Sequence, residues 1–406
     1  MFINKDRLWD TLETHGAIGG TPDGGVCREA LSPEDVQGRK LFVAWCREAD
    51  LAVACDKIGT IYATRPGKNA SLAPLAFGSH LDTQPTGGKY DGILGVLGGL
   101  EVMRSLNDHN IVTDRPLTLI NWTNEEGSRF VPSMMASGVY TGLFAYEDML
   151  KATDAKGAIF GDELEASGWK GAEEIGARRF HALLELHIEQ GPVLEAKRVD
   201  IGVVTGSQGM NWSHVTINGR SSHAGTTPMP YRLDAMGAMA RLVQTAHGIA
   251  GGTPDACATV GSITTIPSTY NTIPHTVRFT LDMRHPDEAA LQGMLEQFEA
   301  ACAKERAQGF AVKREEFGST PAQQFAPQCV AAVRKAVEEA GYAHADIVSG
   351  AGHDCVYVNR VCPVGMIFVP CKDGLSHNPK ESITREQAAA GADVLYRTVR
   401  DLSRAD

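Results

Sequence analysis

The residues best suited to chemistry are histidines and carboxylates that follow short apolar segments. They offer three imidazoles and two carboxylates: His80, Asp91, Glu126, His187 and His377. This mixture of nitrogen and oxygen donors suits zinc, manganese or a similar divalent metal. One carboxylate can bridge two ions roughly 3.5–4 Å apart, and such a pair can activate a shared water. The pattern therefore favours a metal site.

Each residue alone also has an ordinary alternative. A single histidine is usually structural or exposed, and adjacent glutamates are usually solvated. Glu125 and Glu126, however, follow an apolar segment and precede Gly127, and acids buried there need a compensating charge. Asp82 lies two residues after His80, and in an extended strand such residues share a face. We therefore expect the Asp82 carboxylate to hold the His80 imidazole.

The elements that must position these residues alternate between predicted strands and helices, as in an α/β sheet. Short apolar segments over 75–79, 117–122 and 182–188 predict buried strands, and each stops at polar residues. Helical spacing over 93–106 follows the first of them. Ligands of such sheets bind beyond the carboxyl ends of the strands, so the polar residues at these ends are expected to meet.

The order of predicted elements changes after about Gly209. Strands and helices then follow in the order β-α-β-β-α-β, which is the ferredoxin-like pattern, and one of the predicted strands covers 256–263. Residues 211–327 are thus predicted to form an inserted second domain. The catalytic domain is built from residues 1–210 and 328–406, in which the α/β character returns with a strand at 364–369. A chain of 406 residues is long for a single core and supports two domains.

Composition excludes several classes of function. The formal net charge of −11 argues against a general nucleic-acid binder, which would carry a basic face. The nine cysteines include no CxxC pair and indicate reduced thiols rather than a disulfide framework. No apolar stretch approaches the roughly 20 residues that span a bilayer, and the first residues lack the apolar core of a signal peptide. We expect a soluble, cytoplasmic protein that binds neither nucleic acid nor membrane.

The motifs together resemble a known family, the M20 metallopeptidase superfamily, and within it the carbamoylase branch of N-carbamoyl-L-amino acid hydrolases, zinc-type β-ureidopropionases and allantoate amidohydrolases. The resemblance covers nearly the whole chain. Two features are typical of this branch rather than of the exopeptidases: the short spacing from His80 to Asp91, and a histidine at position 187. The motifs are Gly78-Ser79-His80-Leu81-Asp82, Gly88-Lys89-Tyr90-Asp91-Gly92, Asn124-Glu125-Glu126-Gly127, His187-Ile188-Glu189-Gln190-Gly191-Pro192 and Ser376-His377-Asn378-Pro379.

The resemblance implies an M20-type catalytic domain with two divalent metal ions that share one aspartate. It also implies that Glu125 is the general base, which takes a proton from the attacking water and returns it to the leaving nitrogen. Zinc and manganese are the expected metals, although cobalt and nickel accept the same donors. The implied ligands are His80, Asp91 and His187 for one ion, and Asp91, Glu126 and His377 for the other.

The resemblance further implies that residues 211–327 are a lid or dimerisation domain, and that His223 stabilises the oxyanion from the partner subunit of a homodimer. Gln190, beside the third strand end, is a candidate substrate contact. Gly352 lies in a glycine-rich loop whose exposed amides could bind a carboxylate. The same glycines could equally form only a tight turn.

Asn271 and Arg284 match substrate-binding positions of the family. The planar guanidinium of arginine makes two parallel hydrogen bonds to a carboxylate, which suits Arg284 to an acidic substrate. From the residues alone, an ion pair of Arg284 with Asp282 or Asp287 is the ordinary alternative.

The resemblance favours hydrolysis of an N-carbamoyl amino acid, either N-carbamoyl-β-alanine or an N-carbamoyl-L-α-amino acid, to the amino acid, carbon dioxide and ammonia. Hydrolysis of allantoate or ureidoglycolate is the alternative, because these are also ureido acids. A peptidase or acylase activity fits the short His80–Asp91 spacing and His187 less well. A non-enzymatic binding protein would need a lost ligand or base, whereas all six positions are filled.

Overall fold

The computed structural model describes residues 1–405, and the chain divides into two compact units. Unit 1 consists of residues 1–205 and the chain from 325 onward, and unit 2 consists of residues 206–324. The insertion predicted at 211–327 begins inside β7 (Gly209–Asn218) and ends at the first residue of α10 (Pro327–Ala340). Each unit has its own hydrophobic core.

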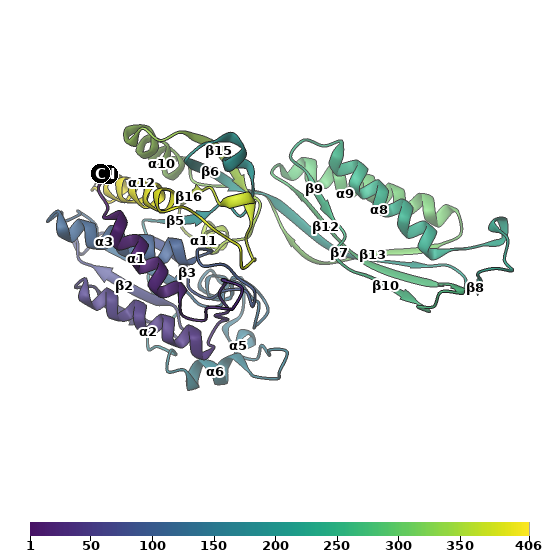
Figure 1. Ribbon diagram of the computed structural model, residues 1–406, viewed down its shortest axis with the longest axis horizontal. Helices are drawn as coiled ribbons and strands as arrows, with labels where there is room; N and C mark the ends of the chain where they lie inside the picture. The colour runs from purple at the N-terminus through teal and green to yellow at the C-terminus, as the bar shows by residue number, and fades with distance from the viewer. Residues whose placement is uncertain (406) are drawn as a thin grey trace. The chain divides into compact units, whose positions relative to one another are not determined.

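A mixed sheet forms the centre of unit 1, with the strand order β1-β2-β4-β3-β5-β16-β6-β14 and with β15 beside β6 (Figure 1). Its four central strands are parallel, so their carboxyl ends lie at one edge. These strands are β3 (Leu75–His80), β4 (Leu117–Trp122), β5 (Ala182–Ile188) and β16 (Val364–Val369). The others are β1 (Ala52–Cys55), β2 (Ile61–Arg65), β6 (Ile201–Ser207), β14 (Gln323–Gln324) and β15 (His344–Ser349).

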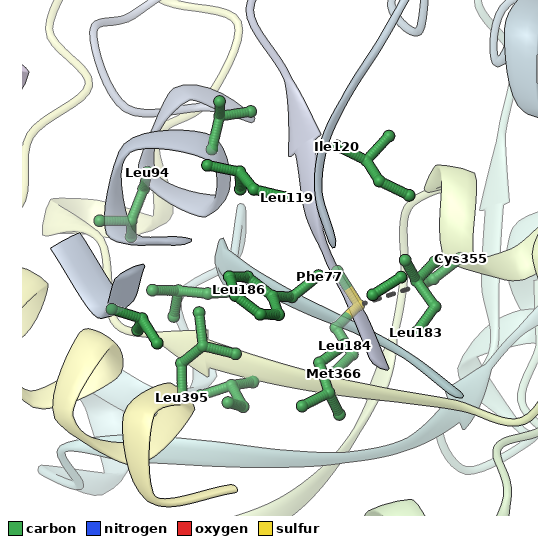
Figure 2. Close-up of a cluster of buried hydrophobic side chains, with 14 of the residues drawn as sticks. Phe77, Leu94, Leu119, Ile120, Leu183, Leu184, Leu186, Cys355, Met366 and Leu395 are labelled. Carbon is green, nitrogen blue, oxygen red and sulfur yellow. Dashed lines mark hydrogen bonds between the residues drawn. The ribbon is translucent and has the colours of Figure 1, made fainter. Parts of the chain in front are cut away.

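Every residue of the four central strands is buried. Strands covered on both faces have continuous apolar runs rather than alternating ones, which explains why these segments stand out in the sequence. Figure 2 shows how their side chains pack with those of α3, α11 and α12. The labelled residues are Phe77, Leu94, Leu119, Ile120, Leu183, Leu184, Leu186, Cys355, Met366 and Leu395.

Helices α3 (Ile93–Asp108), α10 and α12 (Arg385–Leu402) pack against these strands. Thr384 and Gln387 form a reciprocal cap that fixes the start of α12, the last helix of the unit. The remaining helices of unit 1 are α1 (Lys5–Gly16), α2 (Pro33–Glu48), α4 (Met135–Tyr140), α5 (Tyr146–Met149), α6 (Phe160–Ala166), α7 (Val193–Lys197), α11 (Asp354–Val358) and the 3-10 turn η2 (Lys372–Gly374).

In unit 2, helices α8 (Ala235–Gly251) and α9 (Glu288–Ala307) cover one face of an antiparallel sheet with the order β10-β12-β7-β13 (Figure 1). Residues of β7 alternate between buried and partly exposed, as expected of a sheet covered on one face. The single strand predicted at 256–263 is wrong, because two short strands, β9 and β10, replace it. The strands are β7, β8 (Ser222–His223), β9 (Cys257–Thr259), β10 (Ile263–Ile266), β11 (Thr272–Ile273), β12 (Thr276–His285) and β13 (Ala311–Thr320), with a 3-10 turn η1 (Met229–Tyr231).

Residues 1–405 form no helix with the length and apolar character that a membrane crossing requires.

Candidate active site

Two groups of potential metal ligands meet at the carboxyl edge of the sheet in unit 1, and both include Asp91. Oδ1 of Asp91 lies 3.1 Å from Nε2 of His187 and 3.8 Å from Nε2 of His80. Oδ2 lies 3.5 Å from Nε2 of His377, which is itself 3.4 Å from Oε2 of Glu126. One carboxylate thus presents a different oxygen to each group.

Asp91 is held from several sides. Gly92, directly after it, has a φ of +72°, and a Cβ there would lie 2.3 Å from the His80 ring, so the close approach requires glycine. The Gln190 side-chain amide donates to Oδ2 of Asp91 (2.8 Å), and the Ser376 hydroxyl donates to the same oxygen. Gln190 therefore lies beside the metal-ligand groups.

The expected contact between the Asp82 carboxylate and His80 is wrong. Strand β3 ends at His80, so the backbone leaves the extended form, and Nδ1 of His80 donates to the Asp82 carbonyl oxygen instead (2.9 Å). This bond leaves Nε2 of His80 available as a ligand atom. The Asp82 carboxylate accepts hydrogen bonds from the amides of Glu125 (3.3 Å) and Glu126 (3.2 Å). It holds the loop that carries both glutamates.

Neighbouring residues of an extended segment point in opposite directions, yet Glu125 and Glu126 both face the site. Asn124 explains this, because its φ of +56° turns the chain directly after β4, and Gly127 turns it again with a φ of +63°. Asn124 is fixed by a hydrogen bond from its side-chain amide to the Phe130 carbonyl oxygen (2.7 Å). Oε2 of Glu125 consequently lies 3.4 Å from Nε2 of His80.

The electrostatics of these residues fit divalent cations. Burial, with the nearby charge of Asp354, raises the pKa of Glu125 well above its usual value. Burial, with the charge of Asp91, does the same to the pKa of Glu126. Burial lowers the pKa of His80 to about 4, so its ring is neutral at pH 7. Burial lowers the pKa of His187, but its hydrogen bond with Asp91 and the nearby negative charges together outweigh burial and raise that pKa to about 9. Bound cations would offset the repulsion among the carboxylates and displace the proton of His187, since a neutral imidazole is the form that binds a metal.

Three further buried residues lie at the site and were not predicted from the sequence. The ring of His353 packs edge-on against His187, with 4.6 Å between ring centroids. Glu185 accepts a hydrogen bond from the Ser79 hydroxyl (2.7 Å) and forms a third potential ligand group with these two histidines. Glu381 accepts hydrogen bonds from the amides that lead into the Asp91 turn. The one available signal was the position of His353 directly after a glycine-rich loop.

Gly352 in that loop lies beside the segment that carries the glutamates. A Cβ at this position would lie 2.9 Å from Cε of Met134. The Met134 amide in turn donates to the Glu125 carbonyl oxygen (2.6 Å). Met134 thus lies between Gly352 and the segment that carries Glu125.

The other three candidate residues belong to unit 2. His223 and Asn271 lie together, because the amide of Ala224 donates to the Asn271 carbonyl oxygen (3.0 Å). Arg284 makes the ion pair with Asp282 that the sequence offered as an alternative, at 2.7 Å between Nη2 and Oδ2. His223 lies in a separate two-stranded sheet of β8 and β11, which comes after the end of β7 at Asn218, whereas Arg284 pairs with Met210 near the start of β7.

Comparisons with known proteins identify the family of this chain. The model of peptidase family M20/M25/M40 matches residues 76–401. An N-carbamoyl-L-amino-acid amidohydrolase of Rhizobium meliloti is 48% identical over 98% of this chain and 96% of that protein. An allantoate amidohydrolase of Bacillus subtilis is 31% identical over 97% of both chains. A crystal structure of a hydantoinase/carbamoylase family amidase from Burkholderia multivorans covers 99% of this chain and 98% of that one, with a TM-score of 0.95 and 47% identity. The chain belongs to peptidase family M20/M25/M40 and to its hydantoinase/carbamoylase branch.

Proposed function

We propose that the protein hydrolyses the carbamoyl group of N-carbamoyl-L-amino acids with the help of two divalent metal ions. The observation that carries the proposal is the bridging geometry of Asp91, whose two oxygens face two separate ligand groups with Glu125 beside them. The substrate class follows from the 48% identity to the N-carbamoyl-L-amino-acid amidohydrolase of Rhizobium meliloti. N-carbamoyl-β-alanine belongs to the same chemical class and is included in the proposal.

Two ions bound here would polarise the ureido carbonyl and lower the pKa of the attacking water. Glu125 takes the proton of that water and returns it to the leaving nitrogen, because its carboxylate lies next to His80 and its raised pKa favours holding a proton. Asp82 keeps Glu125 in place through the backbone amide of Glu125. Zinc and manganese both suit the donors, and either fits the proposal.

Unit 2 is proposed to be an inserted domain of ferredoxin-like topology that supplies substrate contacts and the contact between two copies of the chain. Its strand order β13-β7-β12-β10, with both helices on one face, supports this topology. Arg284 is proposed to bind the substrate carboxylate, and His223 and Asn271 are proposed to bind substrate as well.

A second copy of the chain is part of the proposal for a geometric reason. Strand β12 begins at Thr276, four residues after Thr272, which pairs with His223, and it spans about 27 Å to Arg284 at the usual rise per residue. A carbamoyl amino acid is far shorter, so His223 and Arg284 of one chain cannot both contact the same substrate molecule. If both act on one substrate, His223 comes from the partner subunit of a homodimer.

Allantoate is the second candidate substrate, because the Bacillus subtilis allantoate amidohydrolase is similar over nearly the whole length. The test is to remove metals, restore zinc or manganese, and measure ammonia release from N-carbamoyl-L-methionine, N-carbamoyl-β-alanine and allantoate in parallel. Metal-dependent release from a carbamoyl amino acid, with slow release from allantoate, is the expected result. Release from allantoate alone would replace the substrate class and keep the catalytic residues. No release from any of the three would contradict the proposal.

A further inference from the structure

Glu381 is a buried carboxylate that none of the steps above uses. It is 5% exposed and follows His377 by four residues, in a loop rather than at a strand end. Oε1 accepts hydrogen bonds from the amides of Tyr90 (2.8 Å) and Asp91 (3.1 Å). Oε2 lies 3.3 Å from the Ser376 hydroxyl oxygen, whose single proton points mainly to Oδ2 of Asp91. A single side chain therefore contacts the segment before His377 and the turn that carries Asp91.

The backbone of Glu381 contributes as well. Its amide donates to the Asn378 carbonyl oxygen (2.9 Å), which closes a tight turn directly after His377. Within that turn, the Asn378 side chain accepts from the Lys380 amide (2.9 Å). His377 is thus bracketed by Ser376, which Glu381 holds, and by a turn that Glu381 closes.

Gly88 provides the space for this contact. A Cβ on Gly88 would lie 2.1 Å from Cδ of Glu381, closer than any real side-chain carbon approaches another atom. The absence of a side chain at Gly88 therefore lets the Glu381 carboxylate reach the turn before Asp91. The close approach, the two hydrogen bonds accepted from backbone amides and the contact with Ser376 together make this a built contact rather than a chance neighbour.

We infer that Glu381 is a positioning residue that holds Asp91 and His377 in register with each other, so that the ion shared by Asp91, Glu126 and His377 binds tightly. Glu381 contacts none of the reacting atoms and acts through the Asp91 backbone and through Ser376. The inference rests on the proposed function only in requiring two bound ions. Outer residues that orient metal ligands contribute about 10- to 100-fold to metal affinity.

The test is a titration of the metal-free protein with Co²⁺. Calorimetry measures the affinity of each binding step, and visible absorption reports the surroundings of the bound ion. E381D keeps the charge but is one methylene too short to reach both segments, whereas E381Q keeps the reach and the acceptor for the two amides. We expect E381D to weaken one of two Co²⁺ binding steps by about 10- to 100-fold and to alter the absorption band. E381Q should stay closer to wild type in both measurements.

A matched control is E101D. Glu101 is also buried and accepts hydrogen bonds from the Asn4 amide (2.9 Å) and the Ser105 hydroxyl (2.8 Å), but these belong to no ligand segment. Its shortening should lower the stability and leave Co²⁺ affinity unchanged. Wild-type affinity in E381D, an equal loss in E101D, or a loss in E381Q as large as in E381D would each overturn the inference. A wild-type chain that binds fewer than two ions would instead contradict the proposed function itself.

Discussion

Replacement of Glu125 by glutamine separates the proton-transfer role of this residue from its structural role. Glutamine has nearly the same shape, so the loop held by Asp82 and turned by Asn124 should remain as it is. What is lost is the ability to accept the proton of the attacking water. Positioned acid–base groups contribute about 10²- to 10⁴-fold to the rate, which corresponds to about 3–5 kcal/mol in the activation free energy. We expect kcat to fall by that factor while KM changes little.

The same substitution should stabilise the metal-free protein at high pH. The pKa of Glu125 in the folded protein lies above its unfolded value, because burial and the charge of Asp354 disfavour the ionised form. Such a group stabilises the fold below its unfolded pKa, and this contribution is lost as the pH rises through the folded pKa. Glutamine carries no charge, so Glu125→Gln should raise the melting temperature of the metal-free chain at pH 8.

The assay combines ammonia release from N-carbamoyl-L-methionine, metal content by elemental analysis, and thermal unfolding at pH 5 and pH 8. Glu101→Gln is the control, since it alters a buried carboxylate outside the site. A Glu125→Gln protein with two bound ions and wild-type kcat would refute the assigned role. Loss of the ions together with activity would show that Glu125 is a ligand rather than the base.

Three other predictions test separate parts of the site. Gly92→Ala should weaken metal binding, measured by calorimetry, because the new Cβ would meet the His80 ring and a left-handed alanine costs about 1–2 kcal/mol; unchanged affinity would contradict the close approach. Burial and the charge of Asp35 raise the pKa of Asp82 to about 7, so this residue alone should lower the stability of the metal-free protein by about 3 kcal/mol between pH 5 and pH 8. Asp82→Asn should flatten that part of the unfolding profile, and an unchanged slope would argue against it. Inactive His223→Ala and Glu125→Gln chains, unfolded and refolded together, should regain activity at about a quarter of the sites if His223 acts across a dimer, whereas a persistently inactive mixture would argue against that arrangement.

The sequence was informative where a ligand follows a long apolar strand. Burial on both faces makes β3, β4 and β5 mostly apolar, so the polar residues at their carboxyl ends are conspicuous. The strand predicted at 364–369 agrees with β16 for the same reason. Parallel strands then bring their carboxyl ends to one edge, which is why residues far apart in the sequence meet.

Prediction from the sequence failed where backbone direction changes within one or two residues. The role expected of Asp82 assumed that β3 continues past His80, but the strand ends there, and a carbonyl oxygen makes the contact instead. The orientation of Glu125 could not be settled either, because it depends on the left-handed conformation of Asn124. Asparagine tolerates this conformation but does not require it, so the residue type alone does not predict it.

Residues that orient the ligands were harder to find than the ligands. Glu381 and His353 follow no apolar strand, and their partners are distant in sequence: Glu381 contacts Asp91, and His353 contacts His187. Only the folded chain reveals such pairs. The glycine at position 88 is a partial signal, because a glycine next to a ligand-bearing turn indicates that another group approaches closely.

Three non-glycine residues at the site have a left-handed backbone conformation, which turns the chain so that side chains point into the site. Asn124, Gln190 and His377 have φ values of +56°, +58° and +52°. Asn124 precedes the proposed base, Gln190 donates to the proposed shared ligand Asp91, and His377 is itself a proposed ligand. A non-glycine residue in this conformation costs about 1–2 kcal/mol. Gln190 offsets part of this cost by donating to Asp91, and Asn124 does so by donating to Phe130. The fold therefore holds strained backbone that orients the proposed ligands before any ion binds, and ions that bind this arrangement should raise the stability of the folded chain by an amount that grows with the logarithm of their affinity.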